Sequence, residues 1–408
     1  MRRCLVLSLA VLAAVFALSG TAAGGTIAGQ YIVVVKSGFD ARDVARDHAR
    51  SADARVLHTY RAALNGYAAR LTAAGLAKVR ADGRVLAVSA DRTVHALAQS
   101  LPTGVNRIQG DVSSTVSGNG SGSISTRVAV LDTGIDLSHP DLNVVGGKNC
   151  STGKSYADGN GHGTHVAGTI AARDDGVGVV GMAPGAPLYA VRVLNNAGSG
   201  SWSSIACGID WVTANASRLG IKVANMSLGG SGSDGACGSS VLHRAICNSV
   251  SAGVTYVVAA GNSSANFKDF VPAAYDQVLT VTAVADFNGQ PGGGAAATCR
   301  SDVDDTAANF SNWTTAGSAD EAHTIAAPGV CILSSWKGGG YRTISGTSMA
   351  SPHVAGTAAL CFAGPCAGLT PAQVVAKLRA DAAAQPSSYG FTGVSGRSYG
   401  RLVYAGGY

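Results

Sequence analysis

From residue 98 onwards the chain alternates short apolar stretches with glycine-rich turns and helix-forming stretches, and this alternation restricts its fold more than any other feature. The apolar stretches are near-continuous runs of small and branched aliphatic residues, which is typical of strands buried on both faces of a parallel sheet. The sequence therefore predicts a three-layer α/β fold with a mostly parallel central sheet and a functional site at the carboxyl ends of its strands. The predicted strands are 127–131, 188–193, 223–228, 254–260 and 278–284, and the predicted helices are 164–173, 203–219 and 241–252.

Residues 1–23 have the pattern of a secretory signal peptide. Arg2 and Arg3 precede an apolar run over 5–18, and small residues continue to Ala23, where we expect cleavage. The run is shorter than the ~20 apolar residues that a membrane-spanning helix requires, so we expect no membrane partner. The formal charge of +6 is modest and the basic residues are scattered, which gives no support to nucleic-acid binding. We therefore expect a secreted, extracellular protein.

Residues 24–97 are predicted to form a small α+β domain before the main domain at 98–408. The pattern predicts strands over 31–35, 64–71 and 85–88 and helices over 41–54 and 73–81. Before a secreted hydrolase, such a domain is normally a propeptide that assists folding and inhibits the enzyme. An independent binding domain is the alternative.

Polar side chains stand at the ends of three predicted elements of the main domain. Asp132 ends the first strand, and Asn262 follows the fourth strand with an amide that donates hydrogen bonds. His162 stands between glycines at the start of a helix, which leaves room for a hydrogen bond at each ring nitrogen. His165 lies one turn further on, where we expect a buried structural histidine. A metal-binding His-x-x-His pair is the alternative, although the sequence lacks the glutamate of a zinc-protease helix.

The stretch Gly-Thr-Ser-Met-Ala-Ser-Pro-His-Val-Ala-Gly, residues 346–356, places Ser348 between a glycine-bounded turn and an apolar helix. We expect Ser348 at the N-cap of this helix, because Pro352 lacks an N–H group and fits a helix only near its start. The first N–H groups of the helix would then face the group that Ser348 attacks. An ordinary capping serine is the structural alternative. Together with the acid, the imidazole and the amide, however, this serine completes the groups that acyl transfer requires.

The order and composition of these motifs resemble the subtilisin-like serine peptidases. The matching stretches are 130–142 (Val-Leu-Asp-Thr-Gly-Ile-Asp-x-x-His-Pro-Asp-Leu), 161–169 (Gly-His-Gly-Thr-His-Val-Ala-Gly-Thr) and 346–356. The resemblance implies that Ser348 is the nucleophile, His162 the general base and then acid, and Asp132 the group that orients the imidazole. It also implies that Asn262 donates to the oxyanion. A hydrolase of the Gly-x-Ser-x-Gly type is disfavoured, because Ala350 stands where its second glycine would be.

The resemblance also implies how substrate binds and how the chain matures. Ser227, Leu228 and Gly229 resemble the strand that pairs with a protein or peptide substrate and lines the pocket for the residue before the scissile bond. The stretch from Ala98 looks like the mature amino terminus of subtilisins, so we expect cleavage after Leu97 and inhibition by the chain's own propeptide. Because Leu97 would itself be a substrate residue, we expect a preference for large apolar side chains at this position. We expect a monomer.

A structural calcium ion is a further implication of the resemblance. Calcium prefers six or more hard oxygen ligands, and the stretch 173–179 fits the calcium loop of the family without gaps. The alternative is an ordinary solvated turn. The implied ligands are side-chain oxygens of Gln99, Asp141 and Asp175 and backbone carbonyls of Arg173, Val177 and Val179.

Eight cysteines remain beyond the signal peptide, an even number in an oxidising compartment, so we expect disulfides. Eight cysteines can pair in 105 ways. Proximity in the sequence favours Cys237 with Cys247 and Cys361 with Cys366. Cys150 with Cys207 and Cys299 with Cys331 would then remain, although the sequence by itself leaves the connectivity open.

Two other readings of the whole chain remain open from the sequence. One is a catalytically silent relative that binds peptides, and the other is a metal-dependent hydrolase centred on His162 and His165. The stretch 288–306, rich in glycine, alanine and aspartate, is expected to be a surface loop.

Overall fold

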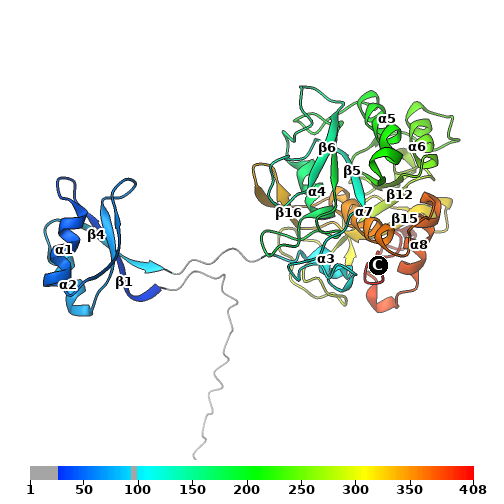
Figure 1. The fold of residues 1–408 in the computed structure, drawn as a ribbon. Coiled ribbons are helices and arrows are strands. Elements are labelled where there is room, and N and C mark those ends of the chain that lie inside the picture. Colours follow the sequence, from blue (N-terminus) through cyan, green and yellow to red (C-terminus); the bar gives the residue numbers. More distant parts are fainter. Residues whose placement is uncertain (1–25, 93–98) are drawn as a thin grey trace, which may run out of the picture. The chain divides into compact units, whose positions relative to one another are not determined.

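The structure, a computed structural model, describes residues 26–92 and 99–408. The predicted signal peptide and the cleavage junction at Leu97 therefore lie outside the described residues. The chain divides between Ala96 and Leu97 into two compact units (Figure 1). No helix in either described range combines the length and the apolar character that a membrane crossing needs.

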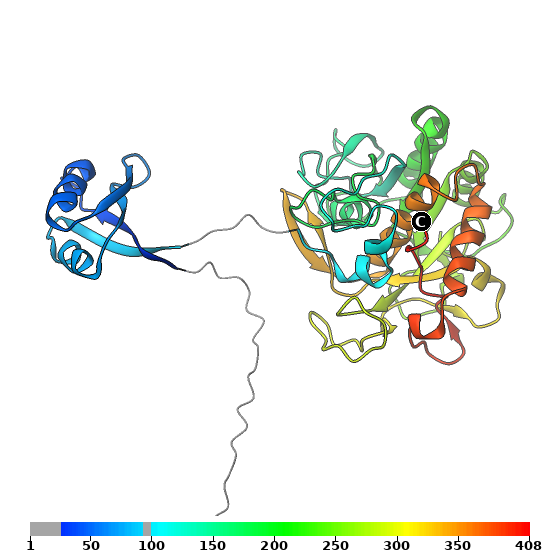
Figure 2. The same ribbon diagram turned by 60° about the horizontal axis from the view of Figure 1, so that its bottom comes forward.

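The first unit is an antiparallel sheet with two helices on one face (Figures 1 and 2). The strand order is β2-β3-β1-β4, and Val33 lies opposite Tyr67 in the central pair. Both side chains pack with Val44 and Val79 from the two helices in one apolar core. The predicted α+β domain is confirmed, although the prediction omits β2, a half-exposed strand. The elements are β1 (Thr26–Val35), α1 (Ala41–Ser51), β2 (Arg55–Tyr60), β3 (Gly66–Arg70), α2 (Ala73–Ala81) and β4 (Val85–Arg92).

The second unit is built on an eight-stranded sheet. Its strands run in the order β13-β12-β10-β8-β5-β7-β6, with β15 also beside β12, and every pair is parallel except β12 with β13. The predicted mostly parallel sheet is thus confirmed. Its strands are β5 (Arg127–Asp132), β6 (Val144–Asn149), β7 (Leu188–Arg192), β8 (Ile221–Met226), β10 (Thr255–Ala259), β12 (Leu279–Ala285), β13 (Thr306–Ala307) and β15 (Thr324–Pro328).

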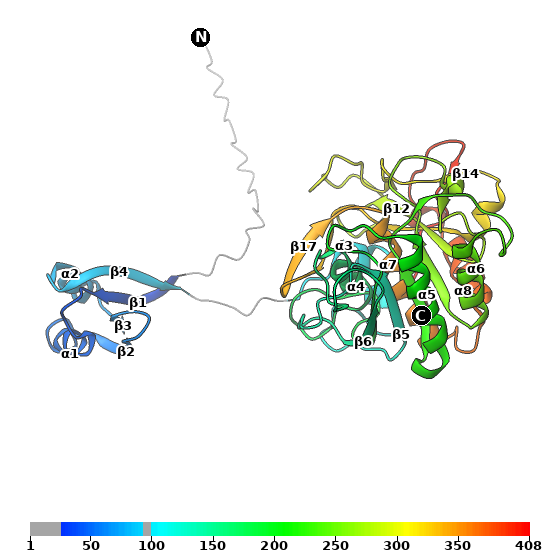
Figure 3. The same ribbon diagram turned by 90° about the horizontal axis from the view of Figure 1, so that it is seen from above.

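Helices cover both faces of this sheet, which can be followed in Figure 3. Successive strand residues face opposite sides: Val128 and Val130 join a core with α3, α4, α7 and α8, whereas Ala129 and Leu131 join a core with α5 and α6. This alternation produces the three predicted layers. The helices are α3 (Thr103–Arg107), α4 (His162–Ala171), α5 (Trp202–Leu219), α6 (Val241–Ser251), α7 (Thr347–Ala363) and α8 (Pro371–Ala383).

Helix ends follow local capping chemistry. Ser201 and Ser204 form a reciprocal capping box at the start of α5, and Gly220 ends that helix in the left-handed conformation. At α7, however, the N-cap is Gly346 and Ser348 is the second helical residue, which corrects the predicted N-cap. Pro352 lies inside α7 rather than in its first turn.

Short elements complete the second unit. The pairs are β9 (Gly230–Ser231) with β11 (Phe270–Val271), β14 (Thr314–Thr315) with β18 (Arg397–Ser398), and β16 (Ile332–Trp336) with β17 (Gly340–Ile344). The 3₁₀ turns are η1 (Gly110–Val112), η2 (Phe267–Asp269), η3 (Ala319–His323) and η4 (Ser387–Tyr389).

The stretch 288–306 is mostly an exposed loop, as predicted, but a buried arginine side chain binds its carboxyl-terminal end. The guanidinium of Arg107, 1% exposed, donates to Asp305 at 2.8 Å and lies 3.1 Å from Asp286. The other oxygen of Asp305 accepts the N–H groups of Gly292 and Gly293. Charge-assisted hydrogen bonds therefore fix the end of the loop, and a disulfide at Cys299 ties its middle to Cys331.

All four predicted disulfides are present. Cys150–Cys207 and Cys299–Cys331 close loops of 57 and 32 residues, and the other two bonds close loops of 10 and 5 residues. The longer loops restrict the unfolded chain most.

Candidate active site

Asp132 and His162 meet at the carboxyl edge of the sheet. The Nδ1–H group of His162 donates to Oδ1 of Asp132 at 2.8 Å, and the N–H of Thr133 donates to the same oxygen at 2.7 Å. Asp132 is fully buried, whereas the side chain of His162 is 26% exposed. The carboxylate thus fixes the imidazole tautomer and leaves Nε2 free on the solvent side.

The position of α4 depends on a second carboxylate. Asp158 accepts the N–H of Gly161 at 2.9 Å and the N–H of Thr164 at 3.0 Å, and it accepts the hydroxyl of Thr133 at 2.9 Å. The close approach of α4 to the turn that follows β5 also requires Gly163, since a Cβ there would lie 2.1 Å from the carbonyl oxygen of Gly134. Asp158 therefore ties the His162 helix to the Asp132 strand, a role that the motif search missed.

Burial and the acidic neighbours of His162 act on its pKa in opposite directions. Burial disfavours the imidazolium, but the charge and hydrogen bond of Asp132, with a contribution from Asp158, outweigh it and raise the pKa of His162 above its ordinary value. An imidazole with this environment is suited to accept a proton and return it.

His165 points away from this site. Its Nε2 lies 3.0 Å from the carbonyl oxygens of Ile332 and Arg342, and the residue is fully buried. Burial lowers its pKa to about 3, so it is neutral. This placement is the predicted structural one and gives no support to a His162–His165 metal pair.

Two hydrogen-bond donors converge beside Ser348. The side-chain oxygen of Asn262 accepts the N–H of Thr347 at 2.8 Å and its hydroxyl at 2.9 Å, which turns the amide Nδ2 the other way. A Cβ built at Gly346 would lie 3.5 Å from this Nδ2 and 3.6 Å from the backbone nitrogen of Ser348. Both nitrogens therefore lie within 3.6 Å of one position beside Ser348, which is the proximity that the two donors of an oxyanion site need.

A buried polar network fixes the helix that carries Ser348. Because Pro352 has no N–H group, the carbonyl of Ser348 lacks its usual helical donor and instead accepts the hydroxyl of Ser227 at 2.8 Å. Asn225 donates to that hydroxyl oxygen at 3.0 Å, and Ser351 donates to Asn225 at 2.7 Å. The hydroxyl of Ser348 itself donates to the carbonyl of Ser227 at 3.3 Å rather than to His162.

A cleft of about 780 Å³ opens beside His162 and runs along the segment Ser227–Gly229. The ring of Phe270 closes one side of this segment: a Cβ at Gly229 would lie 2.5 Å from its Cε1, and one at Gly261 would lie 3.0 Å from it. Phe270 was not predicted from the sequence, and neither were apolar side chains that line the cleft, among them Leu194, Trp202 and Ile205.

The residues expected to bind calcium lie together. Nε2 of Gln99 is 2.6, 3.3 and 3.1 Å from the carbonyl oxygens of Arg173, Val177 and Val179, while its Oε1 is buried without a partner. Asp141 is buried nearby; burial raises its pKa, and the charge of Asp175 adds to this effect. Turning the Gln99 amide over would place its Oε1 beside these three carbonyl oxygens, so the donor set fits calcium.

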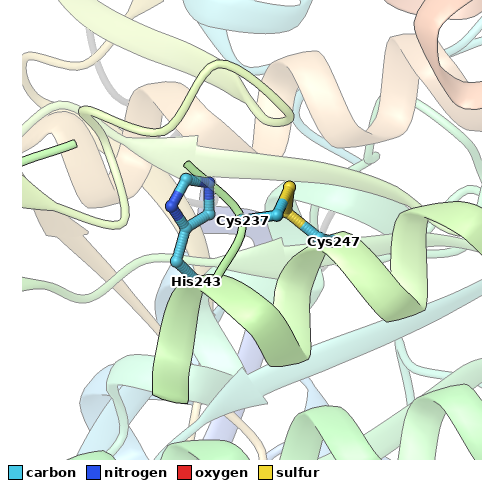
Figure 4. Close-up of side chains that lie close together, drawn as sticks. All are labelled: Cys237, His243 and Cys247. Carbon is cyan, nitrogen blue, oxygen red and sulfur yellow. A yellow bond between two sulfur atoms is a disulfide. The ribbon is translucent and has the colours of Figure 1, made fainter. Parts of the chain in front are cut away.

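One other cluster resembles a metal site but is already bonded. Cys237, His243 and Cys247 lie together (Figure 4), and the two sulfurs form a disulfide. A disulfide supplies no thiolate, which is the form of cysteine that binds metals.

Taken together, a buried acid, an imidazole, a serine at a helix start and two neighbouring nitrogen donors at the edge of a parallel sheet are typical of serine hydrolases. Residues 123–400 match the model of the subtilase family, and residues 30–97 match the peptidase inhibitor I9 family. The chain belongs to the subtilase family, and it is a subtilisin-like serine endopeptidase with an amino-terminal inhibitor propeptide.

Individual relatives agree with this family. Subtilisin DY of Bacillus licheniformis is 42% identical over 267 residues, which are 64% of this chain and 85% of the relative. Subtilisin E of Bacillus subtilis is 40% identical over 302 residues, which are 73% of this chain and 70% of the relative. A crystal structure described as a cold adapted subtilisin-like serine proteinase has a TM-score of 0.53 and 31% identity, covering 80% of this chain and 96% of that one.

Proposed function

We propose that this subtilase is a secreted, self-maturing endopeptidase of broad specificity that works through an ester of Ser348. The observation that carries the proposal is the pair of nitrogens, Nδ2 of Asn262 and the backbone N of Ser348, that lie within 3.6 Å of one position, in a chain whose His162 imidazole is held by Asp132. These are the groups that stabilise a tetrahedral oxyanion and activate a hydroxyl.

The reaction follows from this arrangement. Rotation of the Ser348 side chain away from Ser227 brings its hydroxyl to Nε2 of His162, which removes the proton as Oγ attacks the substrate carbonyl. Asp132 stabilises the resulting imidazolium, and the two donors bind the oxyanion. His162 then protonates the leaving amine, and water hydrolyses the ester by the same steps in reverse.

Substrate is proposed to bind as an extended strand along Ser227, Leu228 and Gly229, so that backbone hydrogen bonds give affinity for many sequences. Leu228 and the Phe270 ring make the adjoining surface apolar. We propose that the pocket prefers large apolar residues before the scissile bond, as Leu97 would be in self-cleavage.

Maturation is proposed to divide the chain into a signal peptide (1–23), an inhibitory and chaperone propeptide (24–97) and a monomeric peptidase domain (98–408). The even number of cysteines in the mature chain, all bonded, supports export to an oxidising compartment.

A peptide library with the residue before the scissile bond varied tests this function. We expect cleavage after leucine and other large apolar residues, complete inhibition by a sulfonyl fluoride, and unchanged cleavage with a zinc-selective chelator. Loss of turnover with the chelator alone would favour a metal-dependent hydrolase, and no turnover with undiminished peptide binding would favour a silent relative. Preferred cleavage after arginine or glutamate would refute the apolar pocket.

We also propose that Gln99, Asp141, Asp175 and the carbonyls of Arg173, Val177 and Val179 bind one structural calcium ion. The orphaned Oε1 of Gln99 and the buried charge of Asp141 support it, because a divalent cation would satisfy both.

Calcium removal is expected to shorten the half-life of the mature enzyme at elevated temperature. A ligand at 1,000 times its dissociation constant stabilises a fold by about 4 kcal/mol, and chelation removes this contribution. Inactivation half-lives with chelator and with added calcium measure the effect. Asp141→Asn should lose the calcium response, whereas the exposed control Asp210→Asn should keep it. Equal half-lives with and without calcium would count against the site.

A further inference from the structure

A second group of metal-binding side chains lies apart from the sites above. His323 is buried, with a side chain 3% exposed, and its Nε2 has no hydrogen-bond partner among the described residues. This nitrogen lies 3.8 Å from Oδ1 of Asp276 and 3.9 Å from Oδ1 of Asp320. The separations are too long for hydrogen bonds, yet the three ligand atoms lie within 4.8 Å of one another.

The contact of the other ring nitrogen, Nδ1, shows which nitrogen of the neutral His323 ring carries the proton. The hydroxyl of Thr280 donates its one proton to the carbonyl of Ala273 at 2.7 Å, so at 3.3 Å it accepts from Nδ1–H of His323. The neutral ring therefore turns a lone pair on Nε2 toward two carboxylates, with no donor between them. Burial lowers the pKa of His323 and so opposes a second proton on the ring, although Asp276 and Asp320 favour one.

We propose that Asp276, Asp320 and His323 bind a divalent transition-metal ion, for which zinc is the best match. An imidazole nitrogen with carboxylate oxygens suits zinc, whereas calcium prefers oxygen ligands alone. Ligands about 2.0–2.2 Å from a tetrahedral zinc lie roughly 3.4 Å apart, so small side-chain movements close the site. The side chain of Asp276 is 60% exposed, which leaves an entry path and room for water as a fourth ligand.

Surrounding groups support these ligands. Thr280 holds the imidazole from behind, and the hydroxyl of Thr314 donates to the second oxygen of Asp320 at 3.1 Å. The charge of Asp234 adds negative potential at His323, and the charge of Arg379 opposes it. The Nε–H group of Arg379 is directed to the carbonyl of Thr324, to which it donates at 3.2 Å. The net environment is negative, as a cation site requires.

The position of the site indicates a structural role. Asp276 precedes β12 and His323 precedes β15, and these strands are parallel, with Thr280 opposite Thr324. The ion would thus clamp the amino ends of two neighbouring strands, whereas Asp132 and Asn262 follow the carboxyl ends of theirs. We expect zinc to stabilise the fold without taking part in catalysis.

The test is a zinc titration of the full-length chain carrying Ser348→Ala, which prevents self-digestion, with calcium present in excess. Calorimetry should show one zinc ion per chain, and cobalt in its place should give the visible absorption bands of a low-symmetry nitrogen–oxygen site. Zinc should also raise the thermal midpoint. Asp276→Asn, a change at an exposed carboxylate, should reduce zinc affinity at least tenfold. It should also abolish the cobalt absorption bands and the rise of the thermal midpoint with zinc.

Asp210→Asn, an exposed aspartate on α5, is the matched control and should bind zinc like the parent chain. His323→Gln should behave like Asp276→Asn. In the active chain, Asp276→Asn should leave kcat/KM unchanged. Zinc binding and peptide hydrolysis are therefore tested separately, and a failure of the zinc proposal leaves the proposed function intact. The proposal is overturned if the parent binds no zinc, or if Asp276→Asn binds it as tightly as the parent.

Discussion

Replacement of Ser348 by alanine is expected to abolish peptide hydrolysis and to leave the precursor uncut at Leu97. Without Oγ no ester forms, and the remaining groups only bind substrate and polarise its carbonyl. In subtilisin itself, the reference enzyme of this family, loss of the serine costs about 10⁶-fold in kcat, and we expect a loss of that order here. The measurements are kcat/KM on an apolar peptide and the mass of the amino-terminal fragment of each purified chain.

Two controls separate the chemistry from folding and from self-cleavage. Ser251→Ala changes an exposed serine at the end of α6 and should mature and turn over normally. A trace of active enzyme added to the Ser348→Ala precursor should release the propeptide and leave a mature domain that resists further digestion, which would show that the junction is intact and the chain folded. If the variant alone is trimmed at Leu97 and still cuts peptide, Ser348 is not the nucleophile.

Replacement of Asp132 by asparagine should lower kcat about 10⁴-fold, the order found for this substitution and for the corresponding alanine change in serine peptidases including subtilisin. The amide donates where the carboxylate accepts, so the imidazole takes the wrong tautomer. The pH profile adds a test that a folding defect would not reproduce. In the parent, activity rises as His162 loses its proton, above the ordinary imidazole pKa of about 6.5.

In Asp132→Asn the acid limb of this profile should move to lower pH. The negative charge and hydrogen bond of Asp132 raise the pKa of His162 against the effect of burial, so their removal lets burial lower it. The measurement is kcat/KM as a function of pH, with Asp210→Asn as the charge control. An acid limb that stayed in place, or a loss below tenfold, would contradict the role of Asp132.

The prediction of the catalytic groups from sequence rests on local signals that are unusually rich. Asp132 at a strand end, His162 between glycines and Ser348 at a helix start each occur in long motifs, and the parallel sheet brings strand ends to one edge. The supporting residues have weaker signals. Asp158 was missed because its bond to Thr133 joins segments 25 residues apart, and the hydrogen bond from Ser227 to the Ser348 carbonyl, which spans 121 residues, could not be predicted although Ser227 itself was placed in the substrate strand.

The elements of the fold likewise divide into those that could be predicted from the sequence and those that could not. Long buried strands such as β5 and β10 were predictable because continuous apolar runs must be covered on both faces. Strands β2 and β17 are partly exposed, and β16, although largely buried, is a short strand with two serines. None of the three was predicted, because their pairing rather than their composition makes them strands. The N-cap of α7 was misplaced because the sequence could not show that Ser227 satisfies the carbonyl that Pro352 leaves free.

By itself the sequence determined the α/β class, the leading α+β domain, the expectation of disulfides from eight cysteines and the set of polar residues proposed for catalysis, whereas the full set of disulfide pairs came from the structure. These depend on periodicity, on cysteine number and on motifs whose chemistry is local. Only the tertiary structure decided that His165 faces the core, that Gln99 gathers three carbonyl oxygens and that His323 meets two carboxylates from separate segments. Such contacts join residues distant in the chain, and the direction of a side chain depends on the packing around it.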